Sequence, residues 1–126
     1  MSDSENTHND APLLSPSEAS KLIESGVILI DVRAETTRID VGAIPDSVTV
    51  SKTAVLEQLE KYAADSGLSE AELHEKQIVV YCSSERGSGP VTEVLVDSGF
   101  ANVAHIDGGF TAWREAGLPV QSAVTD

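Results

Sequence analysis

The sequence predicts an α/β fold: a doubly wound parallel sheet of about five strands with helices on both faces. Two observations predict it. Short runs of consecutive apolar residues, typical of strands covered on both faces, recur along the chain. Segments with helical spacing of apolar residues separate these runs, which is the order expected of a parallel sheet. The length of 126 residues suits one domain with a single core.

The first predicted helix starts close to Ser15. Ser15 can cap a helix, Pro16 suits the first helical position, and Glu18 completes a capping box. Apolar residues at helical spacing follow, and Gly26 ends the segment.

The next segments alternate between apolar runs and polar stretches. Residues 27–30 predict a buried strand that ends at Asp31. Residues 34–46 are polar and contain glycine and proline, which indicates a loop or one irregular turn. Residues 48–50 predict a short strand, and Ser51 is expected to start a second helix.

The second half repeats this alternation. A short capped helix is expected at residues 68–73, and residues 78–81 predict a second buried strand with Cys82 at its carboxyl end. A helix over residues 90–98, a strand at 103–106 and a last helix at 110–116 follow. Because a residue that precedes proline avoids helical angles, we expect Gly89 to lie in a long loop and the helix to begin at Pro90.

The two ends of the chain differ from the part between them. Residues 1–12 are polar and acidic and lack periodicity, and we interpret them as a mobile N-terminal tail. Residues 121–126 resemble them and form the predicted C-terminal tail, so the predicted domain spans residues 13–120.

The charge and cysteine content exclude several classes of function. Eight basic residues against 21 acidic ones leave a net charge of −13, which repels both nucleic acid and anionic membranes. No run approaches the roughly 20 apolar residues of a membrane-spanning helix, and the acidic start lacks the features of a secretory signal. With one cysteine, the chain forms no internal disulfide and no cysteine cage for a metal. We therefore expect a cytoplasmic protein, and nothing in the sequence demands more than a monomer.

Cys82 is the candidate nucleophile. Ligands bind beyond the carboxyl ends of the strands in parallel sheets, and Cys82 and Asp31 both lie at such ends. Inward amides of a tight loop and the start of a helix favour the thiolate over the thiol. The serine hydroxyls and the charge of Arg86 would complete a cradle for anions. The candidate substrate-binding residues are Ser83, Ser84, Glu85, Arg86, Gly87 and Ser88. The alternative is that Cys82 packs as a small apolar residue.

Four blocks of the sequence, in order around this cysteine, resemble the rhodanese-like (single-domain sulfurtransferase) family. They are a strand that ends in Asp-Val-Arg, a Gly-x-Ile-Pro turn, the strand that delivers the cysteine, and a glycine-rich C-terminal third. In this chain they occupy residues 29–33, 42–47, 79–82, and then 99–103, 108–113 and 117–120. The resemblance extends from about Leu14 to Val120.

The resemblance implies persulfide chemistry. The Cys82 thiolate would attack the outer sulfur of a donor such as thiosulfate, expel sulfite, and pass the sulfur from the enzyme persulfide to cyanide or a thiol. No metal or organic cofactor is required. Asp31 and Arg33 are expected to form a buried polar pair that supports the active loop; the alternative is a surface ion pair of little energetic value.

The cysteine loop departs from the family pattern Cys-x-x-Gly-x-Arg-Ser. Glu85 occupies the glycine position, Gly87 occupies the arginine position, and Arg86 lies one place earlier. At about 6 Å and an effective dielectric constant near 20, the charge of Glu85 opposes an anionic donor by up to roughly 3 kcal/mol. We therefore predict poor activity with free thiosulfate and expect a neutral or protein-borne persulfide as the donor.

Three alternatives stay open at this point. A phosphatase loop of the Cys-x5-Arg type needs arginine where the chain has Ser88. A Cys/His pair would use His74 or His105, each of which we expect to be a surface or packing residue. The main alternative is a catalytically weak or inactive module of the same fold that binds a protein partner or senses redox state or sulfur.

Overall fold

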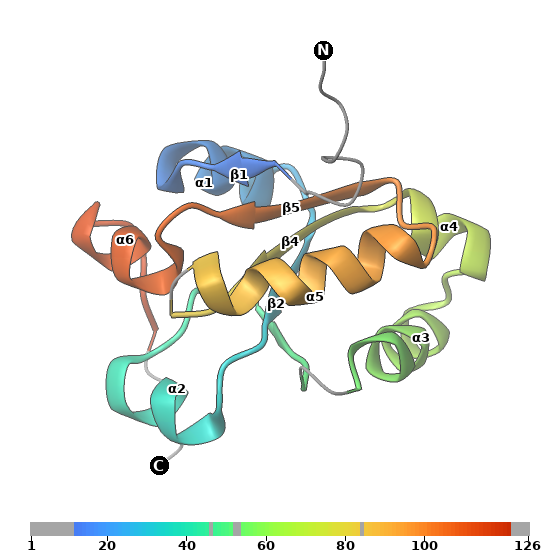
Figure 1. The fold of residues 1–126 in the computed structure, drawn as a ribbon, viewed down its shortest axis with the longest axis horizontal. Coiled ribbons are helices and arrows are strands. Elements are labelled where there is room, and N and C mark those ends of the chain that lie inside the picture. Colours follow the sequence, from blue (N-terminus) through green and yellow to red (C-terminus); the bar gives the residue numbers. More distant parts are fainter. Residues whose placement is uncertain (1–11, 46, 52–53, 84, 122–126) are drawn as a thin grey trace.

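The five strands of the described chain form one parallel sheet in the order β1-β5-β4-β2-β3 (Figure 1). The computed structural model describes residues 12–45, 47–51, 54–83 and 85–121, with the backbone alone at residues 35 and 85–87. The strands are β1 (Leu13–Leu14), β2 (Ile28–Asp31), β3 (Val48–Thr49), β4 (Gln77–Tyr81) and β5 (Asn102–Ile106). The helices are α1 (Pro16–Glu24), α2 (Glu35–Val41), α3 (Val55–Ser66), α4 (Glu70–Glu75), α5 (Glu85–Asp97) and α6 (Gly109–Glu115). The predicted fold class is therefore confirmed.

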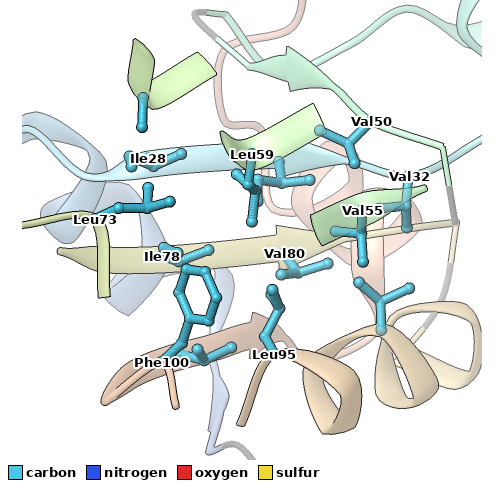
Figure 2. Close-up of a cluster of buried hydrophobic side chains, with 14 of the residues drawn as sticks. Ile28, Val32, Val50, Val55, Leu59, Leu73, Ile78, Val80, Leu95 and Phe100 are labelled. Carbon is cyan, nitrogen blue, oxygen red and sulfur yellow. The ribbon is translucent and has the colours of Figure 1, made fainter. Parts of the chain in front are cut away.

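Helices cover both faces of the sheet because the central strands are apolar on both faces. Alternate residues of β4 point to opposite sides, so Val80 faces one core and Tyr81 the other. The first core packs side chains of α3, α4 and α5 against the sheet, and Figure 2 shows Leu59, Val80 and Leu95 within it. The second core lies under α1 and α6 and contains Trp113.

The predicted helix caps are present. The Ser15 hydroxyl accepts a hydrogen bond from the Glu18 amide at 3.1 Å, and the Glu18 carboxylate accepts one from the Ser15 amide at 3.0 Å. Ser69 and Glu72 form the same reciprocal pair at the start of α4. These caps satisfy amides that the helix itself leaves without partners.

Two local predictions are wrong. Residues 34–46 are not a loop throughout, because α2 occupies Glu35–Val41 and ends at Gly42 with φ +90°. The second helix begins at Val55 rather than at Ser51, whose amide instead donates to the Gln58 side chain at 2.7 Å. The structure also contains β1, which the sequence analysis did not predict; this strand pairs Leu13 with His105.

The start of α5 is a third correction. This helix begins at Glu85 and contains both Gly89 and Pro90, so the loop after Cys82 is short. The proline rule is weaker here for a steric reason: part of the clash is between the proline ring and the Cβ of the preceding residue, and Gly89 has no Cβ. The Thr92 hydroxyl donates to the Gly89 carbonyl at 2.7 Å within this turn.

One residue of each predicted tail, next to the predicted domain, makes a further sheet-like contact, and the rest of both tails lies outside the described residues. The Pro12 carbonyl accepts from the His105 amide at 3.0 Å, and Gln121 forms a two-residue antiparallel bridge with Ala43. No helix in the described part of the chain is long and apolar enough to cross a membrane. Figure 1 shows α2, α6 and the first turn of α5 together at the end of the sheet where β4 and β5 finish.

Candidate active site at the carboxyl end of the sheet

Cys82 follows directly after β4, a central strand of the sheet. Its side chain is 9% exposed and lies on the same face as Val80. It borders a cavity of about 650 Å³ at the carboxyl end of the sheet. The lining residues are Val32, Arg33, Ala34, Thr37, Arg38, Thr49, Val50, Ser51, Gln58, Cys82 and Ser83. The sole thiol of the chain is thus a wall group of a cavity large enough for a small organic ligand.

The start of α6 holds Cys82 and Ser83, called the cysteine segment below, in place. The amide of Phe110 donates to the Cys82 carbonyl at 2.8 Å, and the amide of Thr111 donates to the Ser83 carbonyl at 3.3 Å. Gly109 permits this approach: its φ is +61°, and a Cβ there would lie 2.6 Å from the Cys82 carbonyl oxygen. A glycine at this position is therefore a steric requirement of the site.

Asp31 and Arg33 form the predicted buried pair. The Arg33 Nε donates to Asp31 Oδ1 at 3.0 Å and its Nη2 donates to Oδ2 at 2.7 Å, a two-point contact. Nη2 also donates to the Gly42 carbonyl at 2.7 Å. Burial lowers the pKa of Arg33, but the hydrogen bonds and charge of Asp31 outweigh it, so the net shift is upward. The pair therefore links the end of β2 to the turn that follows α2.

Tyr81 extends this pair on the face of the sheet opposite Cys82. Its hydroxyl donates to Asp31 Oδ2 at 3.0 Å and accepts from the Ile44 amide at 3.1 Å. Burial, and then the negative charge of Asp31, raises the pKa of Tyr81 to about 12. The phenol therefore stays protonated and keeps donating to Asp31 at neutral pH.

Arg33 lies beside two aromatic rings. Its guanidinium carbon is 4.3 Å from the ring centre of Phe110 and 5.2 Å from that of Tyr81. Its Nη1 is buried without a hydrogen-bond partner among the described residues. The cation is thus held by one carboxylate, by the Gly42 carbonyl and by contact with the two rings, an arrangement that limits the movement of the guanidinium beside the cavity.

The predicted substrate-binding residues fall into three groups. Ser83 is exposed and lines the cavity. Ser84 lies outside the described residues, and only the backbone of residues 85–87 is placed, in the first turn of α5. Ser88 is fully buried, and its hydroxyl oxygen lies 2.8 Å from Nδ1 of His105. The structure therefore directs Ser88 toward β5, and His105, which is 7% exposed, is a packed residue.

Two polar residues that line the cavity, Arg38 and Gln58, were not predicted from the sequence. Arg38 reaches the cavity from α2, and its Nη1 donates to the Arg33 carbonyl at 2.7 Å. Gln58 reaches it from α3, and its amide oxygen accepts from the Ser51 amide. The position of Arg38 shortly after the carboxyl end of β2 was a usable signal, whereas nothing local marks Gln58.

The site combines a thiol with an electropositive wall. None of the described residues that line the cavity is acidic, although the chain carries 21 acidic residues. Asp31 neutralises the charge of Arg33, which leaves Arg38 as the charged group on the wall. A nucleophilic sulfur beside a cation suits attack on an anionic or polar substrate.

Comparison with known proteins identifies similar chains. The family model described as "Rhodanese-like domain" matches residues 15–116. The thiosulfate sulfurtransferase GlpE of Pseudomonas syringae pv. syringae (strain B728a) is 34% identical over 99 residues, which cover 79% of this chain and 83% of that protein. A Rhodopseudomonas palustris CGA009 protein of unknown function, named a possible tyrosine phosphatase, superposes with a TM-score of 0.71 at 27% identity, over 96% of this chain and 99% of that one.

A further solved structure shares the fold. The crystal structure of a thiosulfate sulfurtransferase from Pseudomonas aeruginosa superposes with a TM-score of 0.69 at 22% identity, over 89% of this chain and 19% of that one. At this level of identity the likeness concerns the fold alone.

Proposed function

Because this chain belongs to the rhodanese-like family, we propose that it is a sulfurtransferase that moves a sulfane sulfur through a persulfide on Cys82. The observation that carries the proposal is the location of Cys82. The sole thiol of the chain lies at the carboxyl end of a central strand and borders the cavity. A packing role alone does not require a thiol at the mouth of a cavity.

The proposed reaction has two steps. The Cys82 thiolate attacks the sulfane sulfur of thiosulfate, the S–S bond breaks, and sulfite leaves with the bonding electron pair. The persulfide anion on Cys82 then gives its outer sulfur to cyanide or to a thiolate, and the Cys82 thiolate leaves with the electron pair. No electrons are exchanged with an outside agent, so the cycle requires no redox cofactor.

The remaining predicted residues have supporting roles in this proposal. Ser83 and the amides of the first turn of α5 stabilise the persulfide anion. Asp31 and Arg33 hold the end of β2 to the turn at Gly42, and Arg33 itself lines the cavity together with Cys82. A reducing compartment such as the cytoplasm suits the reaction, because Cys82 must stay a free thiol.

The donor is thiosulfate or a persulfide. The matched GlpE proteins are named for thiosulfate. In this chain the negative charge of Glu85 and the net charge of −13 oppose a divalent anion, so we propose weak use of free thiosulfate.

The proposed function is tested by weighing the intact protein after incubation with thiosulfate or with a small-molecule persulfide. A gain of one sulfur atom that is absent in Cys82→Ser, and that cyanide removes as thiocyanate, supports the proposal. A correctly folded protein that gains no sulfur from any donor contradicts it and favours a binding or sensing module.

The likeness to a possible tyrosine phosphatase adds a comparison to this test. A loop of the Cys-x5-Arg type needs arginine at the position that Ser88 occupies, and the Ser88 hydroxyl points to His105. We therefore expect no hydrolysis of an aryl phosphate by the same preparation.

A further inference from the structure

We propose that the cavity beside Cys82 takes small organic persulfides that carry a carboxylate, and that Arg38 is the specificity-determining residue that binds this carboxylate. The inference rests on the proposed sulfur transfer and names the substrate class of the same site. Three features of the cavity carry it: its size, its charge and the arrangement of its polar wall.

The cavity is larger than thiosulfate requires. At about 30 Å³ for each water-sized group, the five heavy atoms of thiosulfate fill roughly 150 Å³. The cavity measures about 650 Å³, within the range of roughly 300–1,000 Å³ that is typical of sites for organic ligands. A donor with an organic group on the inner sulfur would fill the remaining space and displace its water.

Apart from the start of α5, where the charge of Glu85 opposes a divalent anion, the described wall of the cavity favours a single carboxylate on the ligand. The described lining residues include no aspartate or glutamate, in a chain with a net charge of −13. Asp31 already neutralises Arg33. Among the residues that the structure describes, the guanidinium of Arg38 makes one hydrogen bond, to the Arg33 carbonyl, and has no carboxylate partner. A half-buried cation that has spare donors and lines a cavity is suited to a carboxylate ligand.

The polar residues of the cavity wall, Arg38 and Gln58, would also orient the ligand. The hydrogen bond from Arg38 Nη1 to the Arg33 carbonyl, at 2.7 Å, limits the freedom of the guanidinium before a ligand binds. The amide oxygen of Gln58 accepts from the Ser51 amide at 2.7 Å, so its NH₂ group is the part left to donate to a ligand. A ligand with a carboxylate on Arg38 and a polar group near Gln58 would therefore have one preferred orientation relative to Cys82.

The chemical step follows from this placement. The Cys82 thiolate attacks the terminal sulfur of R–S–SH, a bond forms between Cys82 Sγ and that sulfur, and the S–S bond to R–S breaks. The R–S⁻ thiolate leaves with the electron pair, and Cys82 keeps the S–SH group with its proton. Arg38 touches only the carboxylate of R, so it contributes to donor affinity more than to the bond exchange.

A matched pair of donors tests the inference: mercaptopropionate persulfide, and the persulfide of the corresponding uncharged amide. We expect the wild type to prefer the carboxylate donor by about tenfold to a hundredfold in kcat/KM, the range expected of one charge-assisted hydrogen bond. In Arg38→Gln this preference falls to near unity, mainly through KM, and Arg38→Lys keeps part of it. Lys21→Gln, which removes one exposed positive charge on α1, on the opposite face of the sheet, keeps the full preference.

A measurement of ligand binding tests the carboxylate site without any sulfur transfer. S-methyl mercaptopropionate has no sulfane sulfur, and it should slow the alkylation of Cys82 by iodoacetamide in the wild type but not in Arg38→Gln; its amide should have little effect on either. This result supports the carboxylate site even if no donor forms a persulfide, in which case only the proposed function fails. Equal use of both donors by the wild type, or an unchanged preference in Arg38→Gln, overturns the inference and leaves the proposed function standing.

Discussion

The hydroxyl oxygen of Ser88 lies 2.8 Å from Nδ1 of His105, and both side chains are buried. Ser88 belongs to the first part of α5, shortly after Cys82, and His105 belongs to β5. In the sheet His105 is in register with Val80, and Cys82 follows two residues later on the same face. The hydrogen bond therefore joins the helix that follows the candidate nucleophile to the strand beside it.

Breaking this contact should cost stability. We expect Ser88→Ala and His105→Leu each to lower the free energy of unfolding by about 1 to 3 kcal/mol, because each leaves a buried polar group with one partner fewer. The double variant should lose less than the sum of the two, by about 1 kcal/mol, in urea titrations. His105→Asn, which keeps a polar group near the position of Nδ1, should restore part of the loss. If the losses of the two single variants simply add up in the double variant, the Ser88–His105 hydrogen bond makes no measurable contribution to the free energy of unfolding.

The raised pKa of Tyr81 predicts a loss of stability at high pH. The folded state holds this proton to about pH 12, whereas the unfolded chain releases it near pH 10. The contribution is fully present below pH 10 and disappears as the pH rises toward 12, with a total of about 2 to 3 kcal/mol. Thermal unfolding between these pH values measures it.

Two variants test whether Tyr81 causes this loss of stability at high pH. In Tyr81→Phe the loss of stability across the same pH range should be smaller, because the raised pKa of Tyr81 no longer contributes to it. Tyr62→Phe should keep the loss of the wild type, and its tyrosinate absorbance should appear only at the higher pH. An absorbance change near pH 10 in Tyr62→Phe would contradict the assignment.

The close approach of Gly109 to the cysteine segment predicts a large effect of a single methyl group. Gly109→Ala should lower the free energy of unfolding by well over the about 1 to 2 kcal/mol that a left-handed conformation costs a non-glycine residue. The excess arises because a Cβ at this position lies 2.6 Å from the Cys82 carbonyl oxygen. We expect the alkylation rate of Cys82 to change as well, since the segment must move.

Gly117 offers a matched control. It has φ +78°, close to the +61° of Gly109, but a Cβ there meets no atom within 4 Å. Gly117→Ala should therefore show the conformational cost alone and leave the alkylation of Cys82 unchanged. If the two variants lose equal stability, a Cβ at residue 109 is accommodated without a steric cost, and the prediction is wrong.

The fold could be predicted where the determinants are local. The apolar run of β4 and the reciprocal cap of Ser15 and Glu18 depend on neighbouring residues, and both are present as predicted. The start of α5 could not be predicted from the rule for residues before proline, because that rule depends in part on a Cβ that Gly89 lacks. The polar segment of α2 shows no apolar periodicity, since one side of the helix lines the cavity instead of a core.

The candidate site could be predicted only in part, for a similar reason. Cys82, Asp31 and Arg33 follow apolar strands, so the sequence marks them as lying at one edge of the sheet. Arg38 and Gln58 reach the same cavity from α2 and α3, and their placement depends on how these helices pack. Ser88 is the reverse case: its position near Cys82 in the sequence suggested a place in the site, but its hydroxyl points toward β5.

The last prediction concerns Glu85, where the family pattern has glycine. Glu85 is the first residue of α5, shortly after Cys82, and in the proposed function its charge opposes the approach of thiosulfate. Glu85→Gln should raise kcat/KM for thiosulfate by about tenfold, and Glu85→Gly should raise it similarly at some cost to the helix start. The gain should shrink as salt is added, because added ions screen the repulsion. Glu24→Gln removes the same charge from the end of α1 and should leave the rate unchanged. If Glu85→Gln leaves the thiosulfate rate unchanged at low salt, the weak use of thiosulfate has a cause other than this charge.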